Sequence, residues 1–85
     1  MNYLLNNNLS LKAKGTLSLL LALKESDIKI TYESIQHFAT DGKDSVHLAI
    51  QELKKHGYVN IKKVSTGGVF RGNNWFVYKD NYKDE

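Results

Sequence analysis

The side chains best suited to recognition chemistry lie on one face of a predicted helix in the middle of the 85-residue chain. Apolar residues recur at helical spacing on one side of that helix, namely Val46, Ala49, Ile50 and Leu53. The opposite side carries Asp44, His47, Leu48, Gln51 and Lys55. A helix fits the major groove of B-DNA, where Gln pairs with adenine and an apolar side chain contacts the thymine methyl. We therefore predict base contacts from four residues, Ser45, His47, Leu48 and Gln51.

Positive charge gathers in the same half of the chain. Between Lys43 and Arg71 there are six cations and two anions, which gives +4, whereas the remaining residues carry six cations and seven anions, which gives −1. Such an asymmetry is typical of a nucleic-acid binder, although charge alone fits a solvated basic surface equally well. The predicted contacts to the DNA backbone are Lys43, Lys54, Lys55, Lys62, Lys63 and Arg71.

Catalytic and metal-binding interpretations fail on spacing. Gly42-Lys43 is similar to the end of a phosphate-binding P-loop, but His37 stands where the first glycine should be and Asp44 where Ser or Thr should be. His37, His47 and His56 lack the spacing of metal ligands, and the sequence has no cysteine. We expect no enzyme activity, no cofactor and no bound metal.

Length and composition indicate one small domain without disulfides. The absence of cysteine and of a visible secretory signal favours a cytoplasmic protein. The leucine-rich stretch from Leu17 to Leu23 is far too short to span a bilayer, so no membrane association is expected.

The first half of the chain predicts two helices and a short strand. Ser10 is a plausible N-cap for a helix that runs to about Lys24. Its inward stripe is predicted to be Ala13, Thr16, Leu17, Leu20 and Leu21, whereas Leu19 and Leu23 either widen the core or form a dimer contact, with the core preferred. The alternation around Lys29 predicts a short strand at 28–30. Thr31 can cap a second helix whose inward residues are predicted to be Tyr32, Ile35, Phe38 and Ala39.

The second half predicts a third helix and a hairpin. Asp41 is expected as the N-cap. Asp44 at the N3 position is expected to form an arrangement similar to a capping box with it. The helix is expected to run to His56 and to end at Gly57. Strands at 58–64 and 75–78 then flank a long loop that contains Gly67, Gly68 and Gly72.

These elements predict an α+β fold of the winged helix-turn-helix type, with three helices, a short strand and a C-terminal two-stranded wing hairpin. Residues 1–85 are expected to form a single domain. It would comprise an arm at 1–8, a helical core at 9–57 with the helix-turn-helix at about 31–56, the wing hairpin at 58–78 and a tail at 79–85.

Three stretches resemble a known family. Residues 9–15 (LSLKAKG) are similar to the opening of winged-helix domains from Gram-positive bacteria, their phages and their plasmids. Residues 41–46 (DGKDSV), 49–53 (AIQEL) and 57–58 (GY) resemble the recognition helix of that group, and 75–78 (WFVY) its closing strand. Many relatives have arginine at the position of His47 and a small polar residue at that of Leu48. The resemblance implies double-stranded DNA binding, in replication initiation of the replisome-organiser or DnaD-like type or in transcription regulation.

A protein-interaction module of the same fold, an adaptor or a dimer, is the alternative. Leu48 on the recognition face and the pair Leu19 and Leu23 favour it. Homodimers or other replication and regulatory proteins are therefore possible partners, besides double-stranded DNA. Trp75 and the nearby tyrosines offer base stacking to a single strand, but a core position is the preferred interpretation for alternating aromatics in a closing strand.

Overall fold

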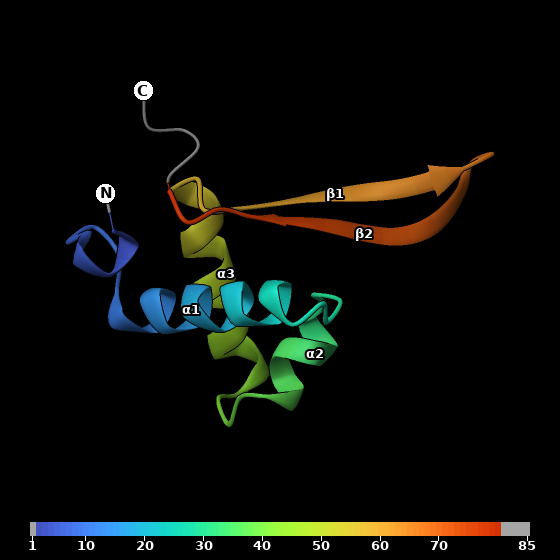
Figure 1. The fold of residues 1–85 in the computed structure, drawn as a ribbon. Helices are drawn as coiled ribbons and strands as arrows, with labels where there is room; N and C mark the ends of the chain where they lie inside the picture. The colour runs from blue at the N-terminus through green and yellow to red at the C-terminus, as the bar shows by residue number, and fades with distance from the viewer. Residues whose placement is uncertain (1, 81–85) are drawn as a thin grey trace.

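The structure, a computed structural model, describes residues 2–80 and contains three α-helices followed by a C-terminal antiparallel hairpin (Figure 1). Its elements are a 3-10 turn η1 (Tyr3–Leu5), helices α1 (Leu11–Glu25), α2 (Tyr32–His37) and α3 (Lys43–Lys55), and strands β1 (Val59–Thr66) and β2 (Val69–Val77). Helix α1 crosses α3, and the hairpin starts at the end of α3, runs alongside α1 and extends beyond the helices at its tip. The predicted α+β class, with three helices before a hairpin, is confirmed. Within residues 2–80, none of the helices combines the length and hydropathy needed to cross a bilayer.

Helix α1 supplies the centre of the core. The Ser10 hydroxyl accepts a hydrogen bond from the Ala13 N–H at 3.1 Å, which confirms the predicted N-cap. The side chains of α1 that are buried are Ala13, Leu17, Leu20 and Leu23. Because Leu23 is only 2% exposed, the preferred interpretation of this residue as core is confirmed. Leu19 is partly buried and packs against the same cluster.

The short strand predicted at 28–30 is wrong. Helix α1 ends in a Schellman motif, in which Asp27 adopts φ 57° and the Ile28 N–H donates to the Leu23 carbonyl at 3.0 Å. The following residues run beside β2 without pairing to it, and the sheet in the described chain has two strands. A hollow lined by Ile28, Lys29, Asn73 and Trp75, among others, separates the two segments. Alternation alone does not make a strand without a hydrogen-bonding partner.

Helix α2 begins as predicted but ends early. Thr31 and Ser34 form a capping box, with the Ser34 N–H donating to the Thr31 hydroxyl at 3.0 Å. Ile35 is buried, but the helix ends at His37, so Phe38 becomes its C-cap and is 53% exposed. The prediction that Phe38 packs inward is therefore wrong, because it assumed that the helical period continued for another turn.

Helix α3 starts one residue later than predicted. Gly42 is its N-cap, and no side chain makes a capping hydrogen bond there, so the expected Asp41 cap and the imitation capping box are wrong. The Asp41 carbonyl instead accepts from the Gln36 amide at 2.7 Å and closes the turn between α2 and α3. The helix ends at Lys55, one residue before the predicted His56, which is its C-cap. Gly57 ends the helix as predicted, with φ 84°, and the Tyr58 N–H donates to the Leu53 carbonyl at 2.9 Å.

The hairpin occupies the predicted part of the chain, but its strands are longer and its loop is shorter than predicted. Strands β1 and β2 pair from Val59–Val77 to Thr66–Val69, which leaves Gly67 and Gly68 as a two-residue turn. Both glycines have positive φ, 59° and 80°, as a type I′ turn requires. The expected long loop is therefore wrong. The positive φ of these adjacent glycines closes the tight turn and lets the strands continue to it.

One polar contact fastens the start of α1 to α3. The Glu52 carboxylate accepts two hydrogen bonds from Ser10, from its N–H at 2.7 Å and from its hydroxyl at 2.8 Å. The backbone hydrogen bond is the main cause that lowers the pKa of Glu52 below its ordinary value of 4.5. The contact stabilises the fold while Glu52 is ionised, at pH above about 4.5, and is lost as the pH falls through the lowered pKa.

We expect Glu52→Gln to destabilise the domain by about 1 kcal/mol at neutral pH, since the contact is largely solvent-exposed. The difference from wild type should shrink as the pH falls below the folded-state pKa, because the wild-type carboxyl then becomes protonated. Urea unfolding at several pH values measures the difference in the free energy of unfolding. Gln51→Ala, on the exposed face of α3, is the control. An equal loss of stability at every pH would contradict the assignment.

The N-terminal arm packs on the helices through Tyr3. The Tyr3 hydroxyl hydrogen-bonds the Ser18 hydroxyl at 2.7 Å, and its ring lies against the core. The Asn6 amide donates to the Tyr58 hydroxyl at 2.9 Å. Leu4 and Leu5, in contrast, are exposed. Of the tail, only Lys79 and Asp80 lie within the described residues.

Candidate nucleic-acid interface

Most of the outer face of α3 is exposed. The four apolar residues predicted to face inward are all buried, at Val46, Ala49, Ile50 and Leu53. On the other side, Leu48 is 64% exposed and Gln51 is exposed as well. These two residues line a shallow hollow together with Lys43, Asp44 and His47. The structure therefore brings together three of the four predicted base-contacting residues.

Ser45, one helical turn before Leu48, does not line this hollow. It lines a groove between α1, α2 and the start of α3, beside Phe38 and Asp41. Successive residues of a helix are separated by about 100°, so Ser45 falls on the flank of α3 that faces away from His47. The sequence placed Ser45 near the start of the helix correctly but did not show which flank the groove would occupy.

His47 is held by an aromatic contact that the sequence did not reveal. Its ring stacks on Tyr32 of α2, with centroids 4.2 Å apart and planes inclined by 2°. Tyr32 in turn meets the edge of Trp75 from β2, at 5.0 Å and 75°. Burial raises the pKa of the Tyr32 phenol above its ordinary value of 10.0, so the phenol stays protonated at neutral pH. This chain of three rings joins α2, α3 and the hairpin beside the candidate interface.

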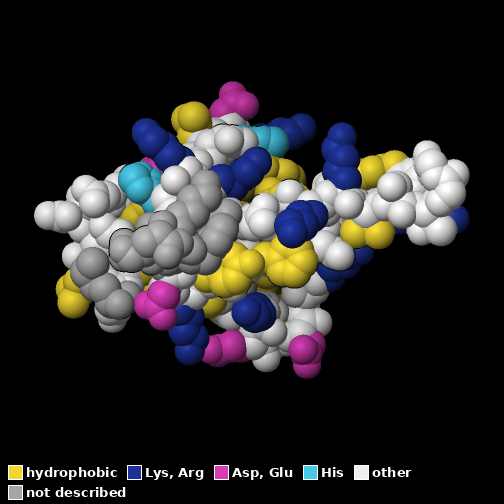
Figure 2. All heavy atoms as spheres, turned by 90° about the horizontal axis from the view of Figure 1, so that it is seen from above, with side chains coloured by type: hydrophobic (Ala, Val, Ile, Leu, Met, Phe, Trp, Pro, Cys, Tyr) yellow, Lys and Arg dark blue, Asp and Glu magenta, His cyan; other side chains and the backbone are white. Residues whose placement is uncertain are grey.

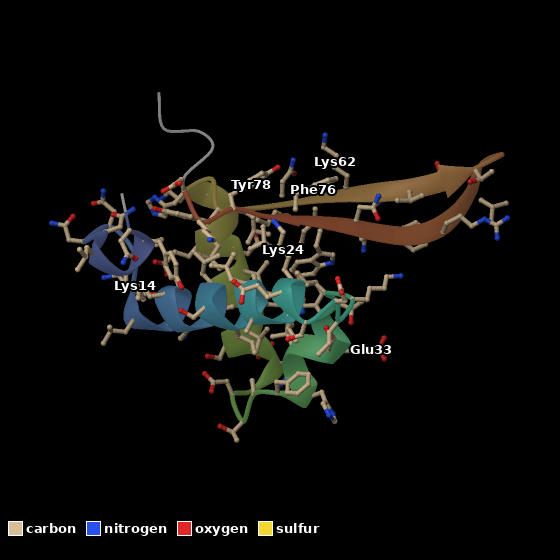
Figure 3. The ribbon with its side chains drawn as sticks, in the orientation of Figure 1. Lys14, Lys24, Glu33, Lys62, Phe76 and Tyr78 are labelled. Carbon is tan, nitrogen blue, oxygen red and sulfur yellow. The ribbon has the colours of Figure 1, made fainter. Side chains whose placement is uncertain are left out.

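The predicted cations fall on several surfaces. Lys43 and Lys55 are exposed at opposite ends of α3, and Lys54 is half-buried. Lys62 and Lys63 are neighbours in β1, so their side chains point to opposite faces of the hairpin. Lys62 lies on the side that faces away from α1, with its Nζ 5.8 Å from the centre of the Phe76 ring (Figure 3).

Arg71 is placed by an irregularity in the hairpin. Val64 pairs with Gly72 and Ser65 pairs with Phe70, so Arg71 is the extra residue of a β-bulge in β2. Gly72 adopts φ 116°, a conformation that strongly favours glycine. A bulge redirects the side chain of its extra residue. The direction of the exposed Arg71 side chain is therefore not set by the regular alternation of side chains along the strand.

The start of α3 offers backbone donors. No side chain caps its first turn, so the N–H groups there point outward at the positive end of the helix dipole. Lys43 adds positive charge at this end, whereas Asp44 adds negative charge beside it. Backbone donors with a lysine suit a phosphate group, and Asp44 reduces that attraction.

Comparisons of the chain with protein-family models, with curated proteins and with solved structures find no match. Among residues 2–80, no three His, Cys, Asp or Glu side chains gather so that they could hold a metal ion. The interface is therefore described by its own geometry: an open helix face, a projecting hairpin and exposed cations on both.

Proposed function

We propose that this chain binds double-stranded DNA, with the outer face of α3 in the major groove and the hairpin beside it. The observation that carries the proposal is the exposure of most of that face. Leu48 and Gln51 are uncovered while every apolar residue of the opposite face is buried, and exposed lysines stand at both ends of the helix. A helix of this kind can enter the groove without disturbing the core.

In this proposal the two parts of the interface have different roles. Gln51 and Leu48 contact base edges, and His47 adds the ring edge that its stack on Tyr32 leaves open. Lys43, Lys55 and the hairpin cations contact phosphates and set the position of the helix on the duplex. The single domain presents a small interface, so tight and specific binding requires a second copy or an attached domain. The winged-helix resemblance connects such binding with replication initiation or transcription regulation.

The direct test is titration of a labelled duplex with the protein at two salt concentrations. Contacts to roughly four phosphates give a log–log salt slope of about −3.6, so affinity should fall about 150-fold between about 50 and 200 mM salt. Absent binding at low salt, or binding that salt leaves unchanged, would contradict the proposal.

We expect Gln51→Ala to change which sequences are bound, in addition to weakening binding. Loss of one bidentate base contact is worth about 1–3 kcal/mol of discrimination at one base position. Selection of preferred duplexes from a random pool by wild type and variant measures the change. Lys55→Gln, one turn further along the same exposed face, is the matched control and should weaken all sequences about equally. An unchanged preference in Gln51→Ala would remove this residue from the base-contacting set.

One observation favours a second candidate, a protein-interaction module. Leu48 is 64% exposed at the centre of an otherwise polar face, where a large apolar side chain suits a protein partner as well as a thymine methyl. Leu48→Asn distinguishes the two. It should shift the preference among duplexes under the DNA proposal, whereas under the protein-interaction alternative neither wild type nor the variant should bind the duplex.

A further inference from the structure

The side of the hairpin that faces away from α1 carries two aromatic rings and a lysine. Val59 and Val77 pair with each other and are buried, so they define the inner face of the hairpin. Phe76 and Tyr78, the residues on either side of Val77, point the opposite way. Figure 3 shows Phe76, Tyr78 and Lys62 together on this outer side at the base of the hairpin.

The strand register arranges polar groups around the rings. Asn60 pairs with Phe76, and Lys62 pairs with Asn74, so all four side chains belong to the outer face. The Lys62 Nζ stands 5.8 Å from the centre of the Phe76 ring. The outer face thus combines two aromatic rings at the end of β2, Phe76 within the strand and Tyr78 just beyond it, with an amide and a cation across from them on β1.

These two rings have little role in the core. Phe76 is 40% exposed, and Tyr78 is half-buried. Figure 2, which looks onto this side of the molecule, shows hydrophobic side chains at the base of the hairpin with lysine or arginine side chains around them. An exposed aromatic surface with positive charge around it is complementary to a ligand that has flat apolar rings and negative charge.

We propose that the outer face of the hairpin binds single-stranded nucleic acid, with bases stacked on Phe76 and Tyr78 and the backbone beside Lys62. Positions two apart on a strand are separated by about 7 Å, twice the rise of about 3.4 Å per nucleotide along one strand of B-DNA. Adjacent bases can therefore stack on the two rings only when the strand is stretched and its bases are unstacked. The paired and stacked bases of a duplex cannot meet this requirement, so the site selects unpaired strands.

Asn60 and Asn74 lie where they can hydrogen-bond the edges of stacked bases, and amide groups accept several base types. Stacking is tolerant of sequence because every base has an aromatic face. The site is distinct from the outer face of α3 and does not depend on duplex binding there.

The test is fluorescence anisotropy with labelled oligothymidine and oligouridine of about twelve nucleotides, a length within the range of known single-strand sites. Phe76→Ala should weaken oligothymidine binding by at least about fivefold, the loss expected for one stacked base. Phe76→Tyr should retain most of the affinity. Phe70→Ala is the matched control, since Phe70 is an exposed aromatic that pairs with Ser65 near the hairpin tip.

The binding of oligothymidine by the variants distinguishes a stacking site from a general effect of aromatic residues. Loss of oligothymidine binding in Phe76→Ala, with Phe70→Ala and Phe76→Tyr near wild type, supports the proposal. The ratio of the affinities for oligothymidine and oligouridine shows whether the site prefers DNA or RNA. Duplex affinity should stay within about twofold in Phe76→Ala, because stacked base pairs do not use the ring. Absent binding of both oligomers, or equal loss in Phe76→Ala and Phe70→Ala, would overturn it whether or not duplex DNA binds.

Discussion

Replacing the lysines at both ends of α3, as Lys43→Gln with Lys55→Gln, is expected to weaken duplex binding about 30-fold at about 150 mM salt. Each phosphate contact releases counterions worth about fivefold in affinity at that concentration. The salt slope should fall from about −3.6 to about −1.8, because two of roughly four phosphate contacts are removed. Titration of the same labelled duplex at several salt concentrations measures both quantities.

The matched control is Lys12→Gln with Lys14→Gln, which removes the same net charge from the first turns of α1. That variant should change affinity by no more than about twofold, because only long-range attraction is lost. An equal loss of affinity in the two double variants would mean that net charge, and not the position of α3, produces the binding. It would contradict the placement of α3 on the DNA.

Truncation of Ile50 is expected to have the largest effect on stability. Ile50 is fully buried in α3, within the cluster that Leu17 and Leu20 of α1 also form. Ile50→Ala removes three carbon atoms and leaves a cavity, which costs about 2–5 kcal/mol. A domain of this size has a small reserve of stability, so the variant should be partly or wholly unfolded at 25 °C. Urea unfolding followed by circular dichroism measures the loss.

Leu48→Ala is the control for this prediction, because it truncates an exposed apolar residue two positions away on the same helix. Its free energy of unfolding should stay within about 0.5 kcal/mol of wild type. The two variants also separate folding from recognition, since Leu48→Ala removes a proposed contact to DNA from an intact fold. A large destabilisation by Leu48→Ala would contradict the exposed position of this residue.

Predictions that depend on local chemistry agreed best with the structure. Ser10 and Thr31 cap their helices, and Gly57 ends α3, because the hydrogen bonds involved join residues three to five apart. The strand at 28–30 was wrong because a strand needs a partner that local alternation does not supply. The predicted strand lengths of the hairpin were wrong because the glycines were interpreted as a long loop, whereas Gly67 and Gly68 form a two-residue turn.

The candidate site was predicted only in outline. Helical period alone located the face of Leu48 and Gln51, because it divides α3 into buried and exposed sides. The stack of His47 on Tyr32 and the groove beside Ser45 depend on how α2 meets α3, which periodicity does not show. The position of Arg71 depends on a one-residue shift in strand register. Gly72 has a positive φ at this shift, but the presence of a glycine in the sequence does not by itself predict a β-bulge.

The most direct test of duplex recognition by α3 is an amide NMR titration of the labelled protein with a short DNA duplex at low salt. Chemical-shift changes should be concentrated in Lys43–Lys55 and in the hairpin, with the largest near Leu48 and Gln51. Amides of α1, on the other side of the core, should change little. Unchanged signals in Lys43–Lys55, or changes confined to the groove between α1 and α2, would contradict duplex recognition by α3.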